Sequence, residues 1–371
     1  MKKILSLILI MALTVSMAGC ALTGEKVVKP AEGKVTAEST AKPKTAPTPT
    51  PTPTPAPQNR NLLTGEATLT EEACGKRPIA VMVNNATANL PQYGISDADL
   101  IFEIPVEGDT TRLMAMYGDY TKVPDICSIR SCRYYFPILA KAFDAMYIHW
   151  GMDPTVAADT LAELYDDNID GNYGSYDLFD RDQERLNEGY DLEHTSVLYG
   201  TRLPTAIREN NLRIDLKENN RNSAFLFNNT PVPAGEESCE RFQVNFGITS
   251  GYGYWSNFSF DAKAKAYQKT HNDDPHMDGR TGKQLAFTNV IILETNIGYL
   301  PDDDSGRREI DVTADHKTGY YISDGAKEKI TWSKEDAYDN LHFYDGAGEP
   351  LKINTGRTYI AVCDEGGFVQ E

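Results

Sequence analysis

Residues 77–85 read Arg-Pro-Ile-Ala-Val-Met-Val-Asn-Asn, in which an unbroken apolar run over 78–83 is followed by two asparagines. Such a run, rich in β-branched residues, is typical of a strand buried on both faces. We therefore predict a strand over residues 79–83. Similar patterns elsewhere in this part of the chain predict strands at 100–106, 112–117 and 145–149 and helices at 137–143 and 155–165.

The order of these elements predicts the fold class. Strands alternate with helices over residues 64–218, which predicts an α/β first domain, a layered mixed sheet with helices. Beyond residue 218 the pattern changes to short strands separated by glycine- and aspartate-rich turns, so we expect a β-rich second domain over 219–371. The strands predicted there are 224–227, 241–246, 254–260, 263–268, 290–293, 309–313, 319–322, 330–332 and 358–362.

The N-terminus has the pattern of an export signal. Lys2 and Lys3 precede an apolar run over residues 4–15, and residues 17–20 read Met-Ala-Gly-Cys. The run is too short for a permanent membrane span, and its flanks are those of a signal peptide over residues 1–19. The Met-Ala-Gly-Cys end fits a bacterial lipobox, which makes Cys20 the lipidation site. We expect acyl chains on Cys20 to hold the protein at the extracytoplasmic face of the cell membrane. Simple secretion is the alternative.

Residues 20–63 are predicted to be a Pro/Thr-rich linker. They contain few large apolar side chains, and Thr-Pro pairs repeat within residues 43–57. Such a segment cannot bury a core. Alternating prolines favour an extended conformation of roughly 3.1 Å per residue, which would hold the folded part away from the membrane. A disordered spacer is the alternative.

The net charge limits the possible partners. The formal charge of −18 becomes −20 when the two positive charges of Lys2 and Lys3 are removed with the signal peptide. This charge argues against general binding to nucleic acid. An anionic partner would need a local basic pocket.

Polar residues at strand ends are the first candidates for that pocket. Asn84 and Asn85 follow the first predicted strand, and His149 ends a later one. Open α/β sheets collect ligands at the carboxyl ends of their strands. A turn that hydrogen-bonds its own backbone is the alternative for the two asparagines.

A second group of candidates contains three arginines. Arg112, Arg130 and Arg133 are close in sequence, and guanidinium groups make planar, bidentate contacts to carboxylates or phosphates. Ser131 lies between two of them. Glu107 precedes Arg112 in a predicted hairpin loop, so structural ion pairs are the alternative for that arginine.

Several motifs resemble those of the YerB-like bacterial lipoproteins. In the first half these are the 77–85 stretch, Asp99 through Thr111-Arg112, Ile129-Arg130-Ser131 with Arg133, and 144–149. In the second half they are Phe179-Asp180-Arg181-Asp182, Glu193-His194, His276-Met277-Asp278, 289–291, 306–307 and 330–334. The resemblance implies an α/β first domain and a separate C-terminal domain in an extracytoplasmic lipoprotein. The motif residues Arg181, His194, His276 and Asp278 complete the set of candidate ligand-binding residues.

Cys127 and Cys132 depart from the family's arginine motif, where glycine and alanine are expected. The pair is a disulfide candidate, provided that the two Cα atoms come within about 7 Å. Such a bond would lock the loop that carries Arg130.

We expect a two-domain envelope lipoprotein that binds a cell-envelope component or an envelope protein through an Arg/His pocket in the first domain. We favour a binding protein over an enzyme and expect no cofactor and no metal. One alternative is an enzyme acting on cell-wall glycan, peptide or a phosphate-linked polymer. The other is a scaffold of envelope machinery without a small ligand.

Overall fold

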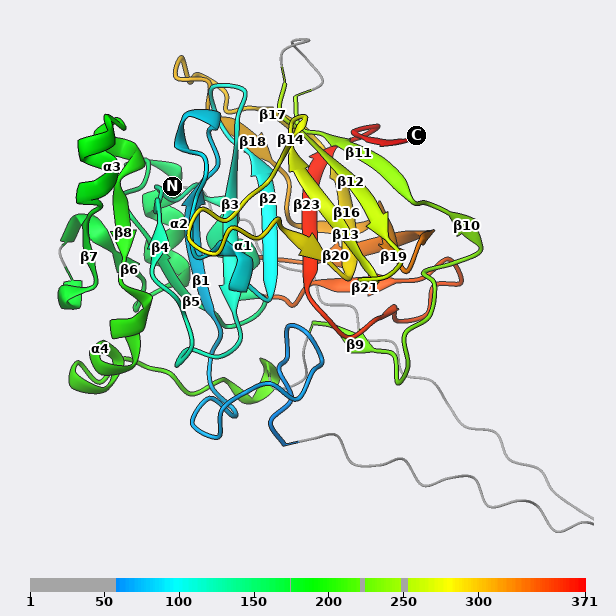
Figure 1. Cartoon of the computed structure of the whole chain (residues 1–371), viewed down its shortest axis with the longest axis horizontal. Helices are drawn as coiled ribbons and strands as arrows, with labels where there is room; N and C mark the ends of the chain where they lie inside the picture. The colour runs from blue at the N-terminus through cyan, green and yellow to red at the C-terminus, as the bar shows by residue number, and fades with distance from the viewer. Residues whose placement is uncertain (1–57, 174, 221–223, 248–252) are drawn as a thin grey trace, which may run out of the picture. The chain divides into compact units, whose positions relative to one another are not determined.

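The computed structural model describes residues 58–173, 175–220, 224–247 and 253–371 (Figure 1). The predicted signal peptide and Cys20 lie outside the described residues, as does most of the predicted linker. The described part contains four α-helices, α1 (Tyr135–Lys141), α2 (Val156–Leu164), α3 (Gln183–Glu188) and α4 (Leu203–Glu209).

The central element is an 11-stranded mixed sheet. In sheet order its strands are β10 (Glu237–Ser238), β20 (Ala326–Lys334), β19 (Ala314–Ser323), β16 (Asn289–Thr295), β23 (Thr358–Asp364), β2 (Leu100–Pro105), β3 (Thr111–Tyr117), β1 (Ile79–Asn84), β5 (Met146–His149) and β6 (Ile169–Asp170), with β21 (His342–Tyr344) paired to β20.

This sheet is shared by the two predicted domains. Strand β23, near the C-terminus, pairs in parallel with β2 on one side and with β16 on the other. Figure 1 shows the red strand β23 beside the cyan strand β2. The α/β and β-rich parts predicted from the sequence are both present. They are joined by backbone hydrogen bonds between β2 and β23.

Both faces of the central sheet are covered, which explains the continuous apolar runs. Successive residues of β1 alternate between two cores: Ala80 and Met82 face one core, and Ile79, Val81 and Val83 face the other. The first core also contains apolar residues of α1 and α2.

A six-stranded sheet supplies much of the second core. Its strands are β14 (Asp274–Pro275), β13 (Ala266–His271), β12 (Trp255–Asp261), β11 (Arg241–Asn245) and β24 (Phe368–Gln370), with β15 (Ala286–Phe287) paired to β13. The strand predicted over 263–268 lies three residues closer to the N-terminus than the observed β13. Asp261 accepts hydrogen bonds from the backbone N–H groups of Lys263 and Ala264, so these residues form a turn and β13 starts later.

Three small sheets complete the described strands. In the first, β8 (Ser196–Leu198) pairs with both β4 (Ile126–Cys127) and β7 (Phe179–Arg181). The other two pair β17 (Ile297–Tyr299) with β18 (Arg308–Ile310), and β22 (Lys352–Ile353) with β9 (Leu226–Phe227). The short 3₁₀ helices are η1 (Thr87–Asn89), η2 (Ile95–Asp97), η3 (Gly171–Tyr173), η4 (Ser175–Asp177), η5 (Leu192–His194), η6 (Gly200–Arg202) and η7 (Glu218–Asn220).

Candidate functional site

The candidate site lies where β1 ends and β3 begins. Asn84, the last residue of β1, is paired in register with Arg112 of β3. The segment that carries Arg130 runs along the same edge, because the Arg130 N–H donates to the carbonyl of Met82 at 3.0 Å. Backbone pairing therefore brings together polar residues from three parts of the chain.

Arg112, Arg130 and Arg133 form ion pairs with two carboxylates among the described residues. Arg130 donates to Glu193 at 2.7 Å, and Arg133 donates to Glu107 at 2.9 Å. The Arg112 guanidinium lies 3.7 Å from the same Glu107 carboxylate. We call these three arginines with Glu107 and Glu193 the arginine cluster. Its three guanidinium groups exceed its two carboxylates by one positive charge.

Arg112 is the buried member of the cluster. Its side chain is 7% exposed and donates a hydrogen bond of 2.7 Å to the carbonyl of Ser131. Burial, and then the nearby charge of Arg130, lower the pKa of Arg112 to about 10. An anion placed between the two guanidinium groups would offset the repulsion between them and favour the charged form of Arg112.

Arg130 and Glu193 form the outer part of the cluster. Their side chains are 26% and 51% exposed. The hydrogen bond from Arg130 holds the pKa of Glu193 below its usual value. Because both groups face water, a ligand could displace this ion pair at a modest cost.

His194 joins the cluster through Asn84. The side-chain N–H of Asn84 lies 2.9 Å from Nδ1 of His194, while Oδ1 of Asn84 accepts a hydrogen bond from the backbone of Ala86. Asn84 is therefore the donor, and Nδ1 of the neutral ring is the acceptor. The hydrogen is then on Nε2, which lies 3.7 Å from Glu193. Burial lowers the pKa of His194 below its usual value.

Two predicted site residues lie beside the cluster. His149 is buried, and its ring nitrogens contact the carbonyl of Gly151 and the side chain of Asn168. The Arg181 guanidinium stacks 4.3 Å from the Trp150 ring centroid. Trp150 in turn donates its backbone N–H to the carbonyl of Arg130. Ser131 contributes its carbonyl to the site.

Asn85 belongs to a different, buried polar network. Its amide donates to Glu103 at 3.0 Å and to Thr111 at 2.7 Å. The other oxygen of Glu103 lies 3.1 Å from the ammonium of Lys269, which comes from β13 of the six-stranded sheet. Ser256 and Tyr359 also donate to Glu103. We call this the Glu103–Lys269 network, and it joins the two halves of the chain.

Burial and charge act in opposite directions on this pair. Burial by itself would raise the pKa of Glu103, but Lys269 and the hydroxyl of Tyr359 hold it below its usual value. Lys269 donates three hydrogen bonds, to Glu103, to the carbonyl of Thr270 and to His276. The ion pair is thus fully hydrogen-bonded, as buried charges require.

His276 and Asp278 connect the second half of the chain to residues 92–96. Nε2 of His276 lies 3.0 Å from Gln92, and Asp278 accepts from the backbone of Ser96 at 2.9 Å. Both side chains are almost fully buried. The structure therefore does not bring His276, Asp278 or Asn85 to the arginine cluster.

No disulfide joins Cys127 and Cys132, the candidate pair, in the structure. Both cysteines are buried and free. Cys127 pairs with Val197 of β8, whereas Cys132 forms a bridge with Met152, so the intervening residues run past the end of β1 without turning back. Burial raises the pKa of each thiol to about 12.

Sequence reasoning missed Lys269 and the role of Glu193. Glu193 immediately precedes His194 in the chain, so the sequence already indicated that Glu193 lies near the His194 ring. Lys269 occupies a buried position in the alternating pattern of β13, between the buried Tyr267 and His271. A charged residue in the buried phase of a strand indicates a buried partner.

The described residues contain no group of three or more His, Cys, Asp or Glu side chains able to hold a metal ion. None of the helices in the described ranges has both the length and the apolar character needed to cross a membrane.

Comparison with known proteins defines the class of protein. Residues 63–213 match the N-terminal domain, and residues 243–360 the C-terminal domain, of a family described as "Protein of unknown function (DUF3048)". The chain belongs to this YerB-like family.

A curated relative is "Putative lipoprotein YerB" of Bacillus subtilis (strain 168). It is 27% identical over 280 residues, which cover 73% of this chain and 77% of the relative. The crystal structure of the YerB protein from Bacillus subtilis matches with a TM-score of 0.70 at 25% identity, covering 83% of this chain and 98% of that chain.

Proposed function

We propose that this protein is a lipid-anchored component of the bacterial envelope that binds an anionic group at the arginine cluster. The ligand would be a carboxylate or phosphate carried by an envelope component or an envelope protein. The observation that carries the proposal is the proximity of Arg112 and Arg130, with three guanidinium groups against two carboxylates. A positive site of this kind is notable in a chain with a formal charge of −18.

The anchor is supported by the lipobox at residues 17–20 and by the name of the Bacillus subtilis relative, a lipoprotein. Cys20 would carry the acyl chains after removal of residues 1–19. Two or more chains are needed for stable attachment, since one chain binds a membrane only marginally.

Binding is favoured over catalysis by the state of His194. A general base needs a free ring nitrogen within reach of the proton that it removes. Nδ1 of His194 already accepts from Asn84, and the hydrogen on Nε2 points toward the Glu193 side. His149 likewise has both ring nitrogens occupied elsewhere.

A thermal-shift screen of the full-length chain in detergent micelles tests the site. The probes are inorganic phosphate, glycerol phosphate and galacturonate, each compared with chloride at equal ionic strength. A ligand at about 100 times its dissociation constant adds about 2.7 kcal/mol to the free energy of unfolding. We expect at least one probe to raise the melting temperature.

Arg130→Ala should abolish this shift. Arg208→Ala removes an exposed arginine of α4 and is the matched control, with an unchanged shift expected. Equal shifts in both variants would mean that the probe binds elsewhere in the chain, and no shift with any probe would favour the scaffold alternative. The anchor is tested separately by Cys20→Ser, which should release the protein from the membrane fraction.

A further inference from the structure

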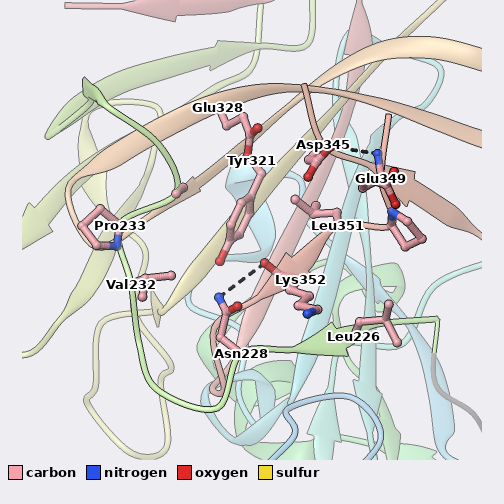
Figure 2. Close-up of a pocket in the computed structure, with 12 residues that line it drawn as sticks. Leu226, Asn228, Val232, Pro233, Tyr321, Glu328, Asp345, Glu349, Leu351 and Lys352 are labelled. Atoms are coloured by element: carbon pink, nitrogen blue, oxygen red, sulfur yellow. Dashed lines mark hydrogen bonds between the residues drawn. The ribbon is translucent and has the colours of Figure 1, made fainter. Parts of the chain in front are cut away.

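A groove in the second half of the chain shares no residue with the arginine cluster. It consists of two adjoining pockets of about 530 and about 240 Å³. Leu226, Pro350 and Leu351 line both pockets and form their common wall. We call this feature the acidic groove, and Figure 2 shows its larger pocket.

One side of the larger pocket is acidic. Glu328, Asp345 and Glu349 lie along it, and Val232 and Leu226 lie along the other side (Figure 2). Glu328 accepts a hydrogen bond from the backbone of Gly346, and Asp345 accepts from the backbone of Glu349. Within the described ranges, no lysine or arginine forms an ion pair with these three carboxylates. Lys352 is the one basic residue among the described residues that line the pocket.

The groove also contains exposed apolar side chains. Leu226 and Val232 are 47% and 44% exposed, which places them among the most exposed large apolar side chains of the described residues. The smaller pocket is lined by Leu341 and Phe343. Exposed apolar side chains grouped around a hollow are typical of interaction sites.

We propose that the acidic groove binds an extended peptide segment of a partner protein, with a lysine or arginine in the larger pocket and an apolar side chain in the smaller one. The three carboxylates supply charge complementarity for the cation, and Leu226 and Val232 contact its aliphatic stem, as long basic side chains require. Two adjoining pockets with a common wall accommodate neighbouring residues of one chain, which a single small cation would not fill.

Fluorescence anisotropy with the full-length chain in detergent micelles tests this proposal. The probes are fluorescein-labelled hexapeptides Ala-Leu-X-Leu-Ala-Gly in which X is lysine, alanine or glutamate. We expect the lysine peptide to bind at least tenfold more tightly than the glutamate peptide, and its affinity to fall as salt is raised. Equal affinities for all three peptides, or no saturable binding, would overturn the proposal.

The combined substitution Glu328→Gln and Glu349→Gln should lower the affinity for the lysine peptide to that for the alanine peptide. Glu188→Gln removes an exposed carboxylate from α3 and is the matched control, with unchanged affinity expected. Leu226→Ala should lower the affinities for the lysine and alanine peptides by similar factors. Retention of full affinity in the double variant would contradict the groove as the site.

Two further outcomes distinguish peptide binding in the groove from binding at the arginine cluster and from self-association. Arg130→Ala should leave peptide affinity unchanged, so failure of the arginine cluster as a site would not affect this test. If the chain instead self-associates, and the double variant dissociates the oligomer, the occupant is a second copy and the peptide proposal is wrong.

Discussion

Asn84 and His194, 110 positions apart in the chain, are joined by a hydrogen bond of 2.9 Å in which the asparagine amide donates to Nδ1 of the ring. The bond selects the neutral imidazole with its hydrogen on Nε2. It also connects the end of β1 to η5, the short helix that presents Glu193 to Arg130. The charge state of the candidate site therefore depends on a neutral amide.

Asn84→Asp should raise the pKa of His194. A carboxylate at this position favours the imidazolium, whereas in the native protein burial holds the His194 pKa below 6.5. A rise of at least one unit is expected by NMR titration of the ring. Asn187→Asp, an exposed change in α3, should leave it unaltered. An unchanged His194 titration in the Asn84 variant would contradict the assigned contact.

Breaking the Glu103–Lys269 pair should strongly destabilise the protein. Glu103→Gln leaves the Lys269 ammonium buried without its counter-charge, at a cost of about 3–5 kcal/mol in the free energy of unfolding. Lys269→Met should cost a similar amount. The double variant should be more stable than the sum of the single effects predicts. Urea unfolding measures all three, and simple additivity would show that the two residues do not interact.

Acid should destabilise the protein through His271. Burial lowers the pKa of His271 from 6.5 to about 4, so the unfolded chain takes up a proton in that window and the folded chain does not. The neutral His271 ring makes its full contribution to stability above pH 6.5. The free energy of unfolding then falls by about 3 kcal/mol as the pH approaches 4. His271→Gln should remove the His271 share of the pH dependence of urea unfolding in this range, while the share of His194, whose pKa burial also lowers, remains. His316→Gln, at an exposed position, is the control and should leave the pH dependence unchanged.

Cys127 and Cys132 should behave as buried thiols. Iodoacetamide should label neither in the native protein and both after unfolding without reductant, as peptide mass spectrometry can determine. Their raised pKa values also slow the reaction, because the thiolate is the nucleophile. Labelling that requires prior reduction would mean that the two cysteines are bonded after all.

The sequence determined the elements whose apolar pattern is local. The run at 79–83 became β1, and helix 137–143 became α1, with Pro137 in its first turn as the fixed φ of proline allows. The β-rich character after residue 218 was equally legible, since short strands and their turns are set by neighbouring residues. The short strands β4, β6, β7 and β8 were not predicted, because segments of two or three residues are too short to show a hydrophobic periodicity.

The sequence also placed Arg112, Arg130 and Arg133 in one group, because Arg130 and Arg133 are close in the chain and Arg112 precedes Arg130 by 18 positions. It could not show that Glu107 contacts two of them, or that Glu193 contacts the third. These contacts depend on side-chain distances between segments as much as 63 residues apart.

Only the tertiary structure decided how the two halves meet. The insertion of β23 between β2 and β16 places it beside β2, whose residues lie more than 250 positions earlier in the chain, and nothing in an apolar strand specifies its neighbour. The same assembly buries Lys269 against Glu103 and removes His276 and Asp278 from the candidate site. Composition and pattern determine which residues are buried, whereas the partners of buried charges follow from the sheet order, which is a property of the whole chain.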